Sequence, residues 1–145
     1  AAYYYAGIDL AEDFNKYEGN GVKRIYQYLE DKTLLYETRF PAPGDVIFWN
    51  NTWDANENGI ADDLLTHVGM MVSMNQLTGQ GTYLHYNYAR GISIENINLL
   101  DPDDPGLNAP IRMRSLPKVE GYRYLSSQLI ESLARAYELE SDLIN

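Results

Sequence analysis

The chain contains no cysteine among its 145 residues, which excludes disulfide bonds and thiolate metal sites within it. It is also poor in basic residues: 11 lysines and arginines stand against 21 aspartates and glutamates, giving a net charge of −10. A protein of this charge lacks the basic surface that binds the phosphates of nucleic acids, so we exclude nucleic acid as a partner. Its apolar runs are far shorter than the roughly 20 residues of a membrane span, so we expect no membrane span.

What remains is the composition of one globular domain. Hydrophobic residues make up 45% of the chain and charged residues 22%, and 145 residues are enough to bury a full core. We therefore predict a single domain over residues 1–145. Its first residues, Ala1–Gly7, read as the last turns of a buried helix that ends at a glycine, yet no N-cap precedes them. We expect the polypeptide to be truncated or processed at this end.

Hydrophobic spacing predicts a helix, a run of strands and a second helix. Asn20 is expected to cap a helix over residues 21–31, whose apolar stripe is formed by Val22, Ile25, Tyr26 and Leu29. Strand composition follows at residues 46–49, 67–73, 82–88, 92–97 and 111–116, the last with its arginines outward. A C-terminal amphipathic helix is expected from the spacing of Tyr122, Leu125, Leu129, Leu133 and Ala136. This order indicates an α+β fold, with a mainly antiparallel sheet of about five strands flanked by helices.

His67, one of the two histidines in the chain, begins a predicted strand. On that strand His67 shares one face with Gly69, while Val68, Met70 and Val72 share the other and form the natural core face. His67 is therefore expected to point into a cleft, where Gly69 leaves room for a substrate. For an isolated histidine, a hydrogen-bonded structural imidazole is the alternative.

The second histidine, His85, lies on the next predicted strand. A hairpin turning at residues 75–81 can bring His67 and His85 side by side on one face. Such a pair suits a general base and a partner that fixes its tautomer. Asn87 shares the face of His85 and is the alternative orienting residue. The alternative interpretation is that the two histidines are unrelated to each other and do not form a catalytic pair.

The acidic loop before His67 has the ligand spacing of an EF-hand-type calcium loop. Glycine stands at position 6 (Gly59), and oxygen ligands are available at positions 1, 3, 5, 7 and 9, namely Asp54, Asn56, Asn58, the Ile60 carbonyl and Asp62. Position 12 departs from the pattern, because Leu65 replaces the glutamate; Asp63 or water is then needed to complete the shell. We predict bound calcium in a structural role, and magnesium fits less well. The alternative is an Asx-rich loop held by its own side-chain turns.

Three segments together resemble the NlpC/P60 family of papain-like cell-wall peptidases: residues 43–49 (PGDVIFW), 66–72 (THVGMMV) and 83–85 (YLH). The resemblance implies a papain-like, CHAP-like fold in which His67 is the catalytic base and His85 orients it. It also implies a nucleophilic cysteine in an Asp-Cys-Ser-Gly motif at the start of a helix, which we expect a few residues before Ala1. The implied partner is a peptidoglycan stem peptide, cleaved at amide bonds that commonly involve D-glutamate and a diamino acid. Such bacterial enzymes work outside the cytoplasmic membrane.

Two other functions stay open. One is a non-catalytic, calcium-stabilised binding or structural module on the same fold. The other is a metallohydrolase in which His67, His85 and a loop carboxylate hold zinc, although no HExxH-like spacing supports it.

Overall fold

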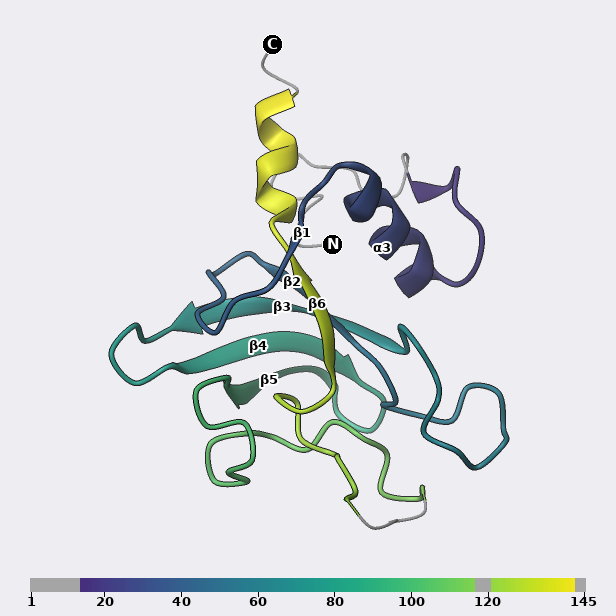
Figure 1. Ribbon diagram of the computed structural model, residues 1–145, viewed down its shortest axis with the longest axis vertical. Coiled ribbons are helices and arrows are strands. Elements are labelled where there is room, and N and C mark those ends of the chain that lie inside the picture. The colour runs from purple at the N-terminus through teal and green to yellow at the C-terminus, as the bar shows by residue number, and fades with distance from the viewer. Residues whose placement is uncertain (1–13, 117–120, 143–145) are drawn as a thin grey trace.

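The structure, a computed structural model, describes residues 14–116 and 121–142 of the chain. It is an α+β fold built on an antiparallel six-stranded sheet with strand order β1-β6-β2-β3-β4-β5 (Figure 1). The elements are α3 (Gly21–Asp31), β1 (Leu35–Tyr36), β2 (Val46–Trp49), β3 (His67–Met74), β4 (Gln80–Asn87), β5 (Gly91–Asn98), β6 (Ile130–Ala134) and the 3-10 helix η1 (Ala136–Asp142). The predicted α+β class with an antiparallel sheet is confirmed, with six strands in place of about five, whereas the predicted helix end at Ala1–Gly7 lies outside the described residues.

Helix α3 begins and ends where the sequence predicts. The Asn20 side chain accepts a hydrogen bond from the backbone N–H of Lys23 at 3.0 Å, which satisfies one of the free donors of the first turn. Leu29 is fully buried, and Val22 and Ile25 pack against the same apolar cluster. The helix therefore uses the predicted stripe to cover one face of the sheet.

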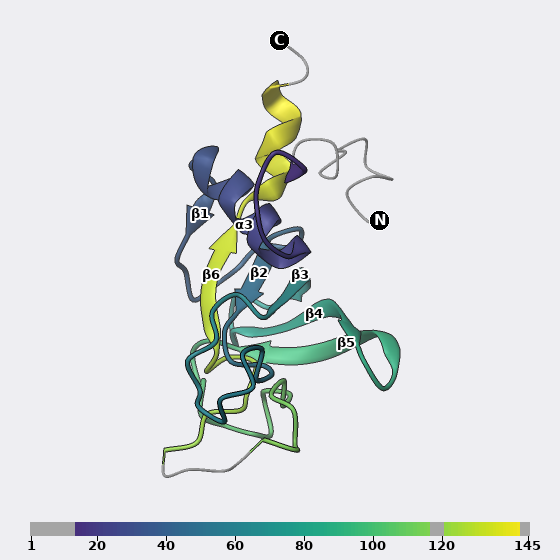
Figure 2. The ribbon, with the colours of Figure 1, turned by 90° about the vertical axis from the view of Figure 1, so that its right-hand side faces the viewer.

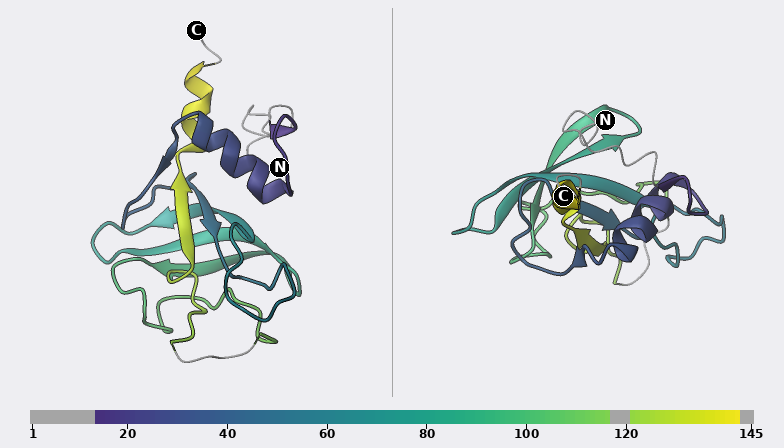
Figure 3. Two further views of the ribbon diagram at one scale, coloured as in Figure 1. Left: turned by 45° about the vertical axis from the view of Figure 1, so that its right-hand side comes forward. Right: turned by 90° about the horizontal axis from the view of Figure 1, so that it is seen from above.

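Two apolar clusters lie on opposite faces of the sheet, because successive residues of a strand point to opposite sides. In β2, Val46 and Phe48 join the cluster that includes α3, whereas Ile47 and Trp49 join the other. Parts of the loop between β5 and β6, such as Ile111, pack against this second cluster. Figures 2 and 3 show α3 and that loop toward opposite ends of the molecule.

The turn that launches β2 is held by a buried carboxylate. Gly44 has a φ of +92°, which favours glycine, and Asp45 follows it with no exposed surface. The Asp45 carboxylate accepts hydrogen bonds from the Ala42 backbone N–H at 2.7 Å and from the Tyr36 hydroxyl. The proline-glycine-aspartate turn thus ties β1 to the start of β2.

The predicted C-terminal helix is wrong. Residues 130–134 form β6, which inserts between β1 and β2 and pairs with both, and a 3-10 helix follows from Ala136. Leu129 and Leu133 fall on one face of this segment and pack in the second cluster. A spacing of four residues returns to the same face of a helix and also to the same face of a strand, so the pattern did not discriminate between them.

The predicted strand at 111–116 is also wrong, and of its two arginines only Arg114 is exposed as predicted. This segment has no strand pairing apart from an isolated bridge between Pro110 and Leu125. Arg112 is buried, with its Nη1 donating to the Asn51 carbonyl at 2.6 Å, whereas Met113 is half exposed. The side chain expected to face solvent is therefore the one that anchors the loop. No helix in the described part of the chain is long and apolar enough to cross a membrane.

Candidate functional site

The two histidines lie side by side at the ends of β3 and β4. Antiparallel pairing sets Gly69 opposite His85, which brings His85 next to His67. His67 Nε2 and His85 Nδ1 are 2.9 Å apart, and the two rings are perpendicular with centroids 5.1 Å apart. This is the contact that the hairpin spacing predicts.

Aromatic side chains surround the pair on the same face of the sheet. The Trp49 ring lies 5.7 Å from the His67 ring, and the Tyr83 ring lies 5.1 Å from the His85 ring, centroid to centroid. Trp49 is fully buried, and its Nε1 donates to the Ser126 carbonyl at 2.7 Å, which fixes the indole against the loop. The histidine pair therefore packs against aromatic side chains, and a hydrogen bond fixes the position of the Trp49 indole among them.

The expectation that Gly69 leaves room for a substrate is wrong. A Cβ at this position would lie 2.9 Å from the Leu84 carbonyl oxygen and 2.9 Å from Cζ3 of Trp49. The glycine is needed because the Trp49 indole occupies the space above it.

The predicted core face of β3 needs a similar correction. Val68 does pack against the cluster that includes α3. Met71, however, is 1% exposed and belongs to the second cluster, on the His67 side, while Val72 is 41% exposed. The register of β3 with β4 shifts between Met71 and Ser73, so the alternation breaks there and neither face is purely polar.

Burial keeps both imidazoles neutral near pH 7. It lowers the pKa of His67 to about 4, with a further lowering from the charge of His85. The pKa of His85 is also lowered, mainly by burial, while Glu95 raises it and Arg90 lowers it. A neutral pair linked at 2.9 Å shares one N–H between His67 Nε2 and His85 Nδ1.

The two outer nitrogens of the pair differ in their surroundings. No described residue hydrogen-bonds to Nδ1 of the half-buried His67. Nε2 of His85 is buried and likewise has no partner among the described residues. When His67 holds its proton on Nε2 and donates it to His85, its Nδ1 is a bare acceptor, which is the form that a general base requires.

Asn87, the alternative orienting residue, caps the turn after β4. Its Oδ1 accepts the backbone N–H of Ala89 at 2.9 Å. The structure therefore brings His85, and not Asn87, into contact with His67.

Sequence reasoning missed a charged pair beside the histidines. Glu95 on β5 lies opposite Tyr83, and Ser93 lies opposite His85, so all four side chains share one face. Glu95 forms an ion pair with Arg90, and its side chain is only 19% exposed. The short β4–β5 connection at residues 88–90 fixes this register, and counting alternate residues back from it would have placed Glu95 on the histidine face.

The acidic loop folds back on its own side chains. The Asp54 carboxylate accepts the backbone N–H groups of Asn58 at 3.2 Å and Gly59 at 2.7 Å, and the Asn58 Oδ1 accepts that of Ile60 at 2.8 Å. The Asn58 and Asn56 side-chain amides both reach the Asp62 carboxylate. Hydrogen bonds therefore link the four residues whose side chains are predicted calcium ligands, and the amide groups of Asn56 and Asn58 contact the Asp62 carboxylate directly.

Two further positions bear on a metal site: Asp63, the expected substitute ligand, and Leu65, which stands where the glutamate would be. Asp63 is buried, and its Oδ1 accepts the Asn56 backbone N–H at 3.2 Å. Leu65, at position 12 of the loop, packs against the cluster that includes α3. Within residues 14–116 and 121–142, no three histidine, aspartate or glutamate side chains form a metal cage, which is the set that the zinc alternative needs.

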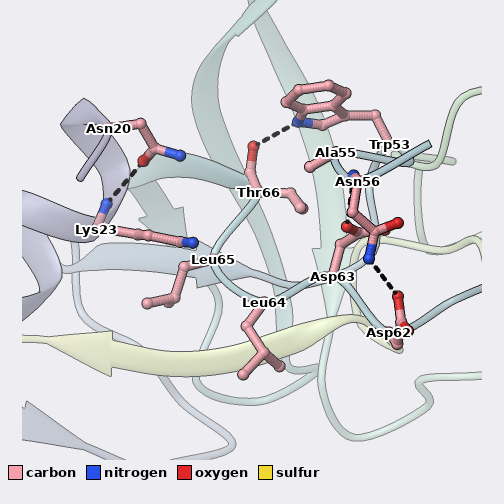
Figure 4. Close-up of a pocket in the computed structure, with 10 residues that line it drawn as sticks. All are labelled: Asn20, Lys23, Trp53, Ala55, Asn56, Asp62, Asp63, Leu64, Leu65 and Thr66. Carbon is pink, nitrogen blue, oxygen red and sulfur yellow. Dashed lines mark hydrogen bonds between the residues drawn. The ribbon is translucent and has the colours of Figure 1, made fainter. Parts of the chain in front are cut away.

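A cavity of about 370 Å³ lies between the start of α3 and the acidic loop (Figure 4). Lys23 lines one side, and Trp53, Asp62 and Asp63 line the other. The Trp53 Nε1 donates to the carbonyl of Thr66 at 3.2 Å, which positions the indole at the cavity wall. The cavity reaches Thr66, the residue before His67, but neither histidine is among its lining residues.

Comparisons of this chain with protein-family models, with curated proteins and with solved structures find no match.

Proposed function

We propose that this protein is the histidine-bearing part of a cysteine peptidase that hydrolyses amide bonds in peptidoglycan stem peptides. The observation that carries the proposal is the 2.9 Å contact between His67 Nε2 and His85 Nδ1, which leaves His67 Nδ1 without a described partner. A base held by a second side chain, with its other nitrogen available, is the arrangement that activates a nucleophile. The segments that resemble NlpC/P60 peptidases assign the same two residues to these roles.

The proposed reaction uses a thiol that the 145 residues do not contain, and we place it on the polypeptide before Ala1. His67 Nδ1 takes the thiol proton, and the thiolate attacks the carbonyl carbon of the scissile amide. The imidazolium then protonates the leaving amine, which departs and leaves a thioester. His67 next takes a proton from water, whose hydroxide attacks the thioester and releases the carboxylic acid and the thiol.

A pKa near 4 suits a base only after its partner arrives. A thiolate next to His67 would raise the histidine pKa, because an opposite charge favours the imidazolium. The same attraction would lower the pKa of the thiol. The proposed nucleophile and base thus activate each other.

The cavity beside the acidic loop supports a peptide substrate that carries both charge signs. Lys23 offers a cation to a carboxylate, while Asp62 and Asp63 offer anions to an amine. A stem peptide with D-glutamate and a diamino acid has both groups. This substrate lies outside the cytoplasmic membrane, and we place the protein there too.

The first experiment establishes the intact polypeptide, by reading its gene before the codon for Ala1. If a cysteine is encoded there, we expect the intact protein to release new amino groups from purified peptidoglycan. His67→Gln should lower this activity by at least about 100-fold, because it removes the general base, and His85→Gln should lower it less. Asn87→Ala serves as the control and should retain activity. Full activity of His67→Gln would refute the assignment.

The second candidate is a non-catalytic, calcium-stabilised module on the same fold. The turns formed by Asp54 and Asn58 in the acidic loop favour this candidate, since they hold the side chains of the predicted calcium ligands close together. A structural calcium site of this kind requires no nucleophile. A gene without a cysteine codon before Ala1 would decide for this module.

A further inference from the structure

One outer nitrogen of the histidine pair, Nε2 of His85, lacks a hydrogen-bond partner among the described residues. His85 is 8% exposed, and this nitrogen is itself buried. A buried polar atom that is left unpaired destabilises the fold, so a partner is expected. The hydroxyl of Tyr83, on the same face of β4, is also buried and without a described partner. Tyr83 and His85 therefore both bring a buried polar atom to this face of β4, and the Tyr83 hydroxyl also lies near Ser126.

One acidic residue is a neighbour of both side chains on this face of the sheet. Glu95 stands directly opposite Tyr83 across the β4–β5 pair and diagonally from His85, which is opposite Ser93. Diagonal neighbours on one face are roughly 7–8 Å apart, within reach of a glutamate side chain. Glu95 is largely buried and is held by Arg90, whose own side chain is 62% exposed. The ion pair is thus exposed to solvent mainly on the arginine side.

The direction of proton sharing depends on that carboxylate. For His67 to present a bare Nδ1, its Nε2 must donate to His85, and His85 must then carry its own proton on Nε2. A buried Nε2–H needs an acceptor, and a carboxylate supplies one. A carboxylate also stabilises the positive charge that reaches the pair when His67 is protonated. The charge of Glu95 raises the pKa of His85, against the larger lowering by burial and a further lowering by Arg90, which agrees with this proximity.

We propose that Glu95 is a positioning residue for the histidine pair, and that its carboxylate exchanges the guanidinium of Arg90 for the Nε2–H of His85. Arg90 then acts as the competing partner for the Glu95 carboxylate, and the ion pair between them is the alternative arrangement. The role in catalysis rests on the proposed function, but the hydrogen bond itself does not.

The test is an imidazole NMR measurement on the chain as it stands, since two histidines give two ring systems and His67→Gln assigns them. In the unchanged chain at pH 7.5 we expect His85 to be protonated mainly on Nε2. Arg90→Gln should increase this fraction, and Glu95→Gln should reduce it to a minority. Ser93→Ala, opposite His85 and uncharged, is the control and should change nothing.

A shorter carboxylate separates a hydrogen bond from a mere charge effect. Glu95→Asp keeps the charge but lacks the reach, so it should behave as Glu95→Gln does. If Glu95→Asp matches the unchanged chain, or if Glu95→Gln leaves the tautomer unaltered, the proposal is wrong. Thermal melting of each variant verifies that it is folded. Because no nucleophile is involved, this result stands whether or not the intact protein hydrolyses peptidoglycan.

Discussion

At the scale of single residues, a histidine kept neutral by burial ties stability to pH. His67 has a pKa of about 4 in the folded chain, against 6.5 for an ordinary histidine. Between these values the unfolded chain binds a proton that the folded chain does not, so stability is present above pH 6.5 and is lost as the pH falls toward 4. The loss amounts to about 3 kcal/mol at most.

We predict that His67→Gln removes this dependence. The unchanged chain should lose stability from pH 6.5 to pH 4 more steeply than the variant, because the variant has no imidazole to protonate there. Urea unfolding at several pH values measures the difference. Comparing the two proteins cancels the contributions of buried carboxylates such as Asp45. Parallel curves for both proteins would contradict the assignment of a low pKa to His67.

We predict that replacing glycine by alanine has opposite effects on stability at two positions, Gly69 and Gly21. Gly69→Ala should destabilise the fold by about 1–3 kcal/mol, because its Cβ would meet the Leu84 carbonyl and the Trp49 indole. Gly21→Ala, at the start of α3, has nothing within 4 Å and should stabilise the fold by up to about 1 kcal/mol. Urea unfolding of both variants at pH 7 tests the pair. A neutral Gly69→Ala would mean that Trp49 can move away.

At the scale of elements, local patterns suffice where the periodicity is unambiguous. The cap and stripe of α3 and the apolar runs of β2 to β5 need no information from the rest of the chain. Strand β1 is only two residues long and exists because it pairs with β6. The spacing of Leu129 and Leu133 fits a helix and a strand equally, and the pairing of β6 with β2 decides for the strand. Long-range pairing, which the sequence does not display, decides both elements.

The candidate site divides in the same way. The contact between His67 and His85 follows from one short hairpin, so it can be predicted from spacing. Glu95 requires the register of a second hairpin, and the bulge in β3 shifts which methionine is buried. The Trp49 indole above Gly69 depends on the packing of a distant loop. These features depend on tertiary contacts, and no local sequence pattern indicates them.

At the scale of the whole molecule, the net charge of −10 opposes the compact state through self-repulsion. Part of that charge is concentrated in the acidic loop, where Asp54 and Asp62 both contact Asn58. A divalent cation bound in the acidic loop would relieve the repulsion between its carboxylates. It would also hold together the loop, which forms one wall of the cavity that reaches Thr66. A calcium ion bound there would therefore have the same structural role in either proposed function.

We predict that calcium raises the melting temperature through this loop. At a calcium concentration of 100 times Kd the stabilisation is about 2.7 kcal/mol, or roughly 5–10 °C for a chain of this size, and magnesium should give much less. Asp54→Asn should abolish the shift, because it removes the charged ligand that orders the turn. Asp101→Asn, an exposed aspartate outside the loop, changes the net charge equally and should retain the shift. Equal shifts in both variants would trace the effect to general charge screening, and no shift at millimolar calcium would remove the metal from the proposal.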